Sequence, residues 1–446
     1  MTDYKIESSY VEPGFSFDDI TVLAVSRSQG GMGENYKCLQ RLLETRETKK
    51  LEEEAVRISE PEHHYNTAVL MLEECDVNSP SYNPKTLRRI KHQLPEIRQK
   101  KSYCQELLAK NQIFGFQDIQ KLAEEYRIKR IGVRMVFGKY LSSQTAKEEA
   151  VFGIAEKFKK EIEIQSMLSH TSIATLYATR ETGGQYEGLW AIIEYVDGMD
   201  LRTILEYEPR IRTGPRPLKP AEASAIILKI AQALKYAHSR GVINRDIKPG
   251  NLMLNFPDGE PKIVDWGIAC FSGERILQVA GTSNYYSPEE ARLELGLEKE
   301  IEIDEKRDFY PLGIVFYELL TSEKPFTDVS GSDIKNIANP DFKPKPIKRW
   351  YEENLYINPR IRRDYQERGW VYDRILDEVC LGMLEKDERK RLKDADLIAE
   401  KLETFLLRQG IKDYTEPLKE LSNELDSWRR KEFEGPSTAA PTAITI

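Results

Sequence analysis

The sequence predicts an α+β fold with two lobes, one containing a β-sheet and one helical. Three runs rich in β-branched and aromatic residues are typical of strands: ITVLAV (20–25), IGVRMVFGKYL (131–141) and LWAIIEYV (189–196). Further along, AEASAIILKIAQALKYAHS (221–239) and LGIVFYELL (312–320) carry apolar residues on most sides of a helix, which indicates helices inside a domain. A few strands followed by many helices favour a small sheet-containing lobe and a larger helical lobe.

Composition limits the classes of function. Of 446 residues, 40% are hydrophobic and 31% are charged, with 66 basic and 74 acidic side chains and a net charge of −8. This is enough apolar material for a folded core. The acidic balance argues against nucleic acid as a partner, because non-specific nucleic-acid binding depends on a basic face.

The cysteines and the N-terminal residues favour a cytoplasmic protein. The five cysteines include no C-x-x-C pair, and their odd number argues against a disulfide framework or a zinc site. No apolar run approaches the ~18–20 residues that span a bilayer, so no membrane association is expected. MTDYKIESSY (1–10) lacks the basic and apolar regions of a signal peptide.

Residues 38–125 differ from the rest of the chain. They are dense in Lys, Arg and Glu with leucine at helical spacing, which predicts three or four helices broken at SEPEH (59–63) and NSPSYNP (78–84). We expect a solvated helical layer, with the adjacent His63 and His64 on its exposed surface.

The strongest indication of chemistry is NRDIKPGNLML (244–254), which brings an aspartate, a lysine and an asparagine into one loop. Phosphoryl transfer to a hydroxyl needs a carboxylate to orient the hydroxyl, a cation near the phosphoryl group and oxygen ligands for a metal. A second aspartate, Asp265, ends the apolar run of KIVDWGIA. One aspartate and one asparagine suffice for Mg²⁺, which keeps several waters and phosphate oxygens as ligands.

These residues resemble the catalytic loop H-R-D-x-K-x-x-N and the D-F-G sequence of eukaryotic-type protein kinases, in the form found in bacterial serine/threonine kinases. The resemblance implies the bilobal protein-kinase fold, with ATP and Mg²⁺ (or Mn²⁺) as cofactors. Asp246 would be the catalytic base, and Lys248 would stabilise the γ-phosphate. Asn251 and Asp265 would bind the metal.

Further signatures follow in the family's order. GTSNYYSPEE (281–290) resembles the end of an activation segment, with Ser-Pro-Glu in place of A-P-E, and DFYPLG (308–313) resembles the start of the central helix of the large lobe. Arg391 is placed like the arginine that pairs with Glu289, and Thr282 like the hydroxyl that closes the substrate site.

Two positions depart from the pattern, since Asn244 replaces the histidine of H-R-D and Trp266 replaces the phenylalanine of D-F-G. Neither change removes a proton acceptor or a metal ligand, so activity is still expected. Arg245 remains, and in the family this arginine pairs with a phosphorylated activation segment. The candidate hydroxyls are Ser272, Thr282 and Ser283.

FKKEIEIQSMLSH (158–170) resembles the family's αC helix, with Glu161 as its ion-pairing glutamate. Its lysine partner is predicted to be Lys139 in VFGKYL, which resembles V-A-I-K; Arg134 and Lys147 are the alternatives.

IIEYVDGMD (192–200) resembles the hinge. There Ile193 would be the gatekeeper, the backbone at Glu194 and Val196 would bind adenine, and Asp200 could reach the ribose.

The glycine loop over the phosphates has two candidates. GGMGENYK (30–37) resembles the loop of bacterial members and supplies Gly30, Gly31 and Gly33, although Ser28 stands where the first glycine belongs and Asn35 replaces the family's valine. Choosing it places residues 38–125 as an insertion between the second and third strands. The alternative is the stretch 132–138, which contains only two glycines. We favour the first candidate.

The expected organisation is an N-terminal segment with glycine-loop strands and helical insertion (1–125), a kinase N-lobe and hinge (126–198), a C-lobe (199–410), a C-terminal helix (411–434) and a disordered tail (435–446). The predicted function is ATP-dependent phosphorylation of protein serine or threonine, with autophosphorylation. A pseudokinase that binds nucleotide or acts as a scaffold is the alternative. Protein partners could bind the helical residues 38–125 or the basic, aromatic stretch 342–372.

Overall fold

The computed structural model describes residues 10–25, 34–41, 46–76, 93–110, 133–148, 153–206, 217–327, 333–357, 362 and 372–434. The chain divides into two compact units. The sheet unit comprises residues 1–162, 176–197 and 427–446, and the helical unit comprises residues 163–175 and 198–426. Within the described ranges, no helix combines the length and apolarity needed to cross a bilayer.

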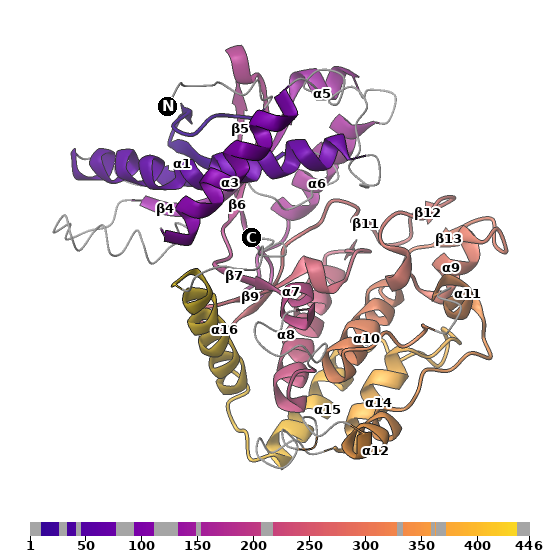
Figure 1. Ribbon diagram of the computed structural model, residues 1–446. Helices are drawn as coiled ribbons and strands as arrows, with labels where there is room; N and C mark the ends of the chain where they lie inside the picture. The colour runs from indigo at the N-terminus through magenta and orange to yellow at the C-terminus, as the bar shows by residue number, and fades with distance from the viewer. Residues whose placement is uncertain are drawn as a thin grey trace. The chain divides into compact units, whose positions relative to one another are not determined.

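The sheet unit is built on one six-stranded sheet with the order β1-β2-β3-β4-β6-β5, and every pair in it is antiparallel. Its elements are β1 (Ser16–Phe17), β2 (Ile20–Val25), β3 (Glu34–Arg41), α1 (Arg46–Cys75), α3 (Leu94–Lys110), β4 (Val133–Ser142), α5 (Ser143–Glu148), α6 (Ile154–Ser166), β5 (Leu176–Thr182), η3 (Gly184–Tyr186) and β6 (Gly188–Glu194). Figure 1 shows α1 and α3 packed against each other beside the strands.

The strand order answers the question of where the insertion lies. β2 and β3 form an antiparallel pair, and β3 pairs with β4 along its full length, from Glu34 opposite Tyr140 to Arg41 opposite Val133. Residues 42–132 are therefore inserted between two neighbouring strands of one sheet. CLQR (38–41) belongs to β3, so the helical segment begins later than expected.

Close packing on one face of the sheet explains a departure from the family's V-A-I-K pattern. A side chain at Gly138 of β4 would meet Cys38 Sγ and the ring of Trp190, each at 3.1 Å. The same indole stacks on Tyr140 with 4.5 Å between ring centroids. Glycine at 138 is thus needed to let the Trp190 ring cross the strand.

Helix α1 is a structural part of this unit, and not the solvated layer that its composition predicts. It runs through Pro61, although a break was expected there, and its Ala68 and Met71 are buried with Tyr36 and Trp190. His63 is 1% exposed, so the expectation that it lies on a solvated surface was wrong; His64 is half-buried. The other expected break, at 78–84, lies outside the described residues.

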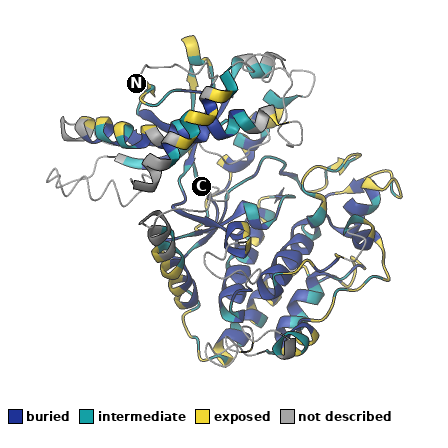
Figure 2. Cartoon of the chain, in the orientation of Figure 1, coloured by how far each residue is buried: buried dark blue, intermediate teal, exposed yellow. Residues whose placement is uncertain are grey.

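The helical unit surrounds two apolar helices, α8 and α10, which appear as dark, buried ribbons in Figure 2. Its helices are α7 (Leu201–Glu206), α8 (Pro220–His238), η4 (Pro249–Asn251), η5 (Ser283–Tyr285), α9 (Pro288–Glu294), α10 (Lys306–Thr321), α11 (Asp333–Ala338), α12 (Ile347–Ile357), α14 (Arg374–Met383), α15 (Ala395–Arg408) and the start of α16 (Glu416–Glu434). Its short strands are β7 (Gly198–Asp200), β8 (Val242–Ile243), β9 (Leu252–Asn255), β10 (Pro261–Ile263), β11 (Cys270–Phe271), β12 (Arg275–Ile276) and β13 (Ile301–Glu302).

The described part of 342–372 keeps basic side chains exposed but buries two of its aromatic rings. Trp350 and Tyr351 are each 2% exposed and pack inside the helical unit. The nearby basic side chains form ion pairs with glutamates of α12, as in Lys345–Glu353 at 2.8 Å and Lys348–Glu352 at 3.8 Å. Partner binding through this stretch stays a prediction. The expected disordered tail, 435–446, lies outside the described residues.

Candidate active site

The loop that follows β8 gathers three of the predicted catalytic side chains around one carboxylate. Asp246 Oδ2 accepts hydrogen bonds from Lys248 Nζ and from Asn251 Nδ2, each at 2.7 Å. Burial raises the pKa of Asp246, the Lys248 ammonium opposes that rise, and the charge of Asp265 adds to it. The carboxylate is thus held in a fixed orientation by two donors.

The second metal-binding candidate is joined to this loop through the backbone. Val264 donates its N–H to the carbonyl of Asn251 at 3.1 Å, which brings the neighbouring Asp265 beside the loop. Asp265 Oδ1 accepts from the N–H of Gly267 at 3.0 Å, so a tight turn orients the carboxylate. Asn251 uses its amide nitrogen toward Asp246, which leaves its carbonyl oxygen as the donor atom for a cation.

Asn244 links these two segments, although it replaces the family's histidine. Its amide nitrogen donates to the backbone carbonyl of Asp265 at 2.8 Å, and its oxygen accepts from the N–H of Asp246 at 3.1 Å. The side chain is fully buried. One uncharged amide therefore ties the predicted catalytic loop to the segment that carries Asp265.

Asp308, a buried aspartate in α10, holds the start of the 244–254 loop through the backbone. Sequence reasoning did not predict this role. Asp308 accepts from the N–H groups of Asn244 at 2.9 Å and Arg245 at 2.8 Å, and it contacts His238 Nε2 at 2.7 Å. Arg245 is held at φ +67, a conformation that non-glycine residues rarely adopt. An aspartate directly before the long apolar run of α10 was the available signal, because a buried carboxylate needs partners.

The activation segment reaches the same loop. Thr282 Oγ1 accepts from Lys248 Nζ at 3.3 Å, and a side chain at Gly281 (φ +111) would lie 3.4 Å from Asp246 Oδ1. Thr282 is half-buried, whereas the other two candidate hydroxyls, Ser272 and Ser283, are exposed. The segment is also held in its middle, where β12 pairs with β13.

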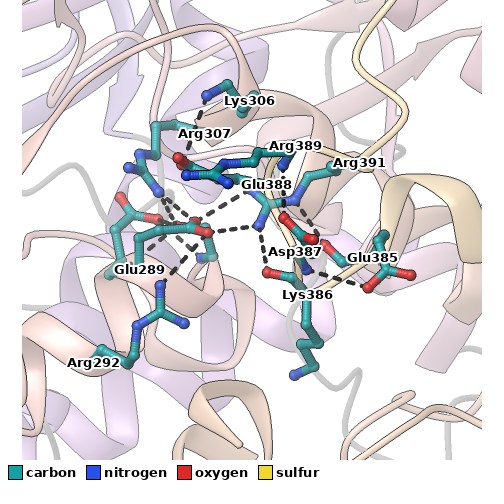
Figure 3. A network of polar contacts seen from close by, with 12 residues as sticks. Glu289, Arg292, Lys306, Arg307, Glu385, Lys386, Asp387, Glu388, Arg389 and Arg391 are labelled. Carbon is teal, nitrogen blue, oxygen red and sulfur yellow. Dashed lines mark hydrogen bonds and ion pairs between the residues drawn. The ribbon is translucent and has the colours of Figure 1, made fainter. Parts of the chain in front are cut away.

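The predicted pair of Glu289 with Arg391 is present, and it is part of a larger network (Figure 3). Arg391 Nη2 lies 2.7 Å from Glu289 Oε1, while Arg307 of α10 binds the other carboxylate oxygen. Burial alone would raise the pKa of Glu289, but Arg391 and Arg307 outweigh it and lower the pKa to about 2. This carboxylate fastens the end of the activation segment to the helical unit.

In the sheet unit, Lys139 of β4 and Glu161 of α6 form a buried ion pair. Lys139 Nζ lies 2.6 and 2.8 Å from the two carboxylate oxygens, and the two side chains are 7% and 4% exposed. Of the alternatives, Arg134 donates to Gln40 Oε1 at 2.7 Å. Lys147 lies in α5, beyond the end of β4. The family's lysine–glutamate pair is therefore present at the predicted positions.

The sheet topology distinguishes the two candidate glycine loops, 30–33 and 132–138. Gly138 lies inside β4 and is paired on both sides, so the stretch 132–138 is not a loop there. Gly30, Gly31 and Gly33 lie outside the described residues, between the paired strands β2 and β3.

The residues predicted to form the hinge lie at the end of β6 and just beyond it. Ile193 is buried at 5% exposure, and Glu194 ends the strand opposite Val136. Asp200 is buried at the start of α7, where its two oxygens accept from the backbone N–H and the hydroxyl of Thr203. It caps that helix, and the proposed ribose contact stays a prediction.

Comparison with known proteins identifies the family. Residues 126–402, well over half of the chain, match the protein kinase domain. The chain belongs to the protein kinase family. β2 and β3 lie ahead of the matched residues, although they share a sheet with β4.

Curated relatives of this kinase include bacterial enzymes. It is 33% identical over 245 residues to serine/threonine-protein kinase PknB of Mycobacterium tuberculosis, which covers 53% of this chain and 35% of PknB. It is 33% identical over 198 residues to serine/threonine-protein kinase PrkC of Bacillus subtilis, which covers 44% of this chain and 28% of PrkC. The matched part spans about a third of the length of these relatives.

Proposed function

We propose that this chain is an ATP-dependent protein kinase that transfers the γ-phosphoryl group to serine or threonine hydroxyls of proteins, its own included. The observation that carries the proposal is the Asp246 carboxylate held between Lys248 and Asn251. The family membership and the names of the bacterial relatives support the serine/threonine class.

Asp246 would orient the substrate hydroxyl and accept its proton as the hydroxyl oxygen attacks phosphorus. Its partner Lys248 would turn from the carboxylate toward the phosphoryl group and stabilise the charge that develops there. Thr282, which already contacts Lys248, would close the substrate side of the loop. Each role uses an atom that the local hydrogen bonds orient before substrate arrives.

Asn251 and Asp265 fit a magnesium ion. One amide oxygen and one carboxylate are the hard oxygen ligands that Mg²⁺ (or Mn²⁺) prefers. When bound, the metal supplies positive charge to the phosphate oxygens. No group of three or more His, Cys, Asp or Glu side chains suited to a metal occurs among the described residues, so the site relies on phosphate and water for its other ligands.

Lys139 would contact the ATP phosphates while Glu161 holds it in place. Gly30, Gly31 and Gly33 would cover the phosphates with backbone N–H groups.

The backbone at Glu194 and Val196 would bind the adenine edge, with Asp200 near the ribose. We also infer a reducing, cytoplasmic location, because Cys38, Cys104, Cys270 and Cys380 are buried free thiols.

The decisive experiment is incubation of the purified chain with γ-labelled ATP and Mg²⁺, alone and with a generic basic protein. Asp246→Asn is the test variant, and Asp341→Asn, at an exposed aspartate, is the matched control. Label on the wild type and control but not on the test variant supports the proposal. Mapping the label then tests Ser272 and Ser283.

The alternative is a pseudokinase that binds nucleotide without turnover. Its support is the set of departures at Asn244, Trp266 and the glycine segment. No label on any variant, together with a rise in melting temperature on adding ATP, would favour this alternative. No label and no thermal shift would favour a scaffold.

A further inference from the structure

Helix α1 covers part of the sheet face that carries Lys139. In the β3–β4 pair, Asn35 lies opposite Lys139, Lys37 opposite Phe137 and Leu39 opposite Met135. Paired residues share a face, and so do residues two apart along a strand. Lys37 is therefore a diagonal neighbour of Lys139, at a typical Cα separation of about 7–8 Å.

On this face, α1 forms a second buried lysine–glutamate pair. Lys37 Nζ lies 2.7 and 2.8 Å from the two carboxylate oxygens of Glu62, and the side chains are 3% and 6% exposed. About two and three turns from Glu62 toward its N-terminus, the helix buries Ala55 and Leu51 in an apolar cluster with Leu39. Helix α1 therefore covers the sheet face beside Lys139, and α6 supplies the partner of Lys139 itself.

The helix also holds the strand end that precedes the glycine segment. Val25, the last described residue of β2, donates its N–H to His63 Nδ1 at 3.2 Å. Its carbonyl accepts from Asn66 Nδ2 at 2.8 Å. Two consecutive turns of α1 therefore bind the backbone from which the glycine segment departs.

The apolar cluster between α1 and the strands also extends to the predicted hinge. Tyr195, between the two proposed adenine-binding positions, packs against the cluster of Leu39, Leu51 and Ala55. Lys37 Nζ lies 5.9 Å from the Tyr195 ring centroid. Phe137, half-buried, stands between Lys37 and Ile193 in the register. Hinge, gatekeeper strand and α1 thus meet on one face.

We propose that α1 forms a wall of the nucleotide site at its base end, and that Lys37 and Glu62 are the positioning residues of this wall. The inference rests on the proposed function, because it takes the Lys139 face as the nucleotide-binding face. Lys139 then orients the phosphates, while the Lys37–Glu62 pair, through α1 and Phe137, shapes the space for the base. The insertion becomes a determinant of nucleotide binding.

The test separates the base from the phosphates by comparing two ligands, a fluorescent ADP analogue and tripolyphosphate, which has no base. Lys37→Met removes the ion pair and is expected to weaken ADP binding about tenfold, with tripolyphosphate binding unchanged. Lys139→Met is expected to weaken both ligands. Glu54→Gln, at a glutamate that pairs with the exposed Arg57, is the matched control on α1.

Two further variants keep the outcome decisive if Lys37→Met folds poorly. The charge-swapped pair Lys37→Glu with Glu62→Lys is expected to return ADP affinity to within about threefold of wild type. Phe137→Ala leaves the ion pair intact and is expected to lower ADP affinity selectively.

Equal losses for ADP and tripolyphosphate in Lys37→Met, or no loss in either Lys37→Met or Phe137→Ala, would overturn the proposal. Tighter ADP binding in Lys37→Met would also overturn it, because α1 would then obstruct the site. Absence of ADP binding in the wild type would instead count against the proposed function.

Discussion

The two units hold their functional residues in different ways. In the helical unit, Asp246, Lys248 and Asn251 lie within six consecutive positions, and hydrogen bonds inside the loop set their geometry. In the sheet unit, Lys139 meets Glu161 from another element, and the neighbouring pair joins Lys37 to Glu62 of the insertion. The first arrangement is local in sequence, whereas the second depends on strand register and helix packing.

This difference teaches where variation is tolerated. Asn244 changes the family's loop, yet its amide makes two hydrogen bonds at the centre of the site. In the sheet unit, a long insertion leaves the strand order intact because it enters between β3 and β4 and packs its own helix on their faces. A local site accepts substitutions that keep its hydrogen bonds, and a sheet accepts insertions that keep its register.

The largest effect is expected from Asp246→Asn, which tests the local arrangement. Loss of the proton acceptor should lower kcat by about 10³-fold or more, because an amide retains the shape but not the basicity. Melting temperature should change little. A steady-state assay together with thermal unfolding checks both, and a large loss of stability would show that the loop is not held as described.

Lys139→Met should lower kcat/KM by about 10²-fold and also destabilise the sheet unit, because Glu161 is left buried without its cation. The joint loss of activity and stability is the expected mark of a long-range site. The control is Lys159→Met, at an exposed lysine of α6, the helix that carries Glu161. Unchanged stability in Lys139→Met would contradict the burial of the pair.

Arg391→Met should lower the free energy of unfolding by about 3 kcal/mol, because the buried Glu289 carboxylate loses a guanidinium partner that is itself fully buried. The pKa of Glu289 is about 2, below its usual value, so its contribution is present above pH 4.5 and lost as pH falls toward 2. Denaturant titrations at pH 7 and pH 3 should therefore differ less in the variant. The exposed Arg389→Met serves as the control.

Glu318→Gln should change the pH dependence of stability. Burial raises the pKa of Glu318 to about 7, with Tyr285 Oη donating to its carboxylate at 3.1 Å. The folded state thus binds a proton that the unfolded state releases near pH 4.5, and wild-type stability should fall by about 3 kcal/mol from this group between pH 4.5 and 7. The variant should lack that decline, while Glu323→Gln, at an exposed position, should keep it.

The smallest effect is expected from Asn244→His. A neutral imidazole can replace one donor and one acceptor, so activity near pH 8 should stay within a few-fold of wild type. Protonation near pH 6.5 would remove the acceptor for the Asp246 N–H, and activity should then fall more steeply on acidification than in the wild type. Parallel pH–rate profiles for the two proteins would contradict this account.

Sequence reasoning succeeded for side chains that share one loop and for distant pairs that the family's pattern links. The lysine partner of Glu161 and the arginine partner of Glu289 were predicted because family spacing supplies the long-range link. The pairs of Arg307 with Glu289 and of Lys37 with Glu62 were not, because nothing in the local pattern reports which distant side chains meet.

The helical periodicity of 38–125 is confirmed over 46–75 and 94–110 and is wrong over 38–41, which form the end of β3. It could not indicate that Pro61 is accommodated within one continuous helix, or that His63 is buried against a strand end. Both depend on the surface that α1 covers, which is built from strands on either side of the insertion.

That insertion also sets an order for chain folding. Arg41 pairs with Val133, so β4 leaves the ribosome several seconds after β3 at synthesis rates of about 5–20 residues per second. Over that interval β3 has no strand on its far side, but α1 is already available to bind Val25 and Lys37. The helix can thus act as an internal chaperone that shields the nascent hairpin until β4 arrives.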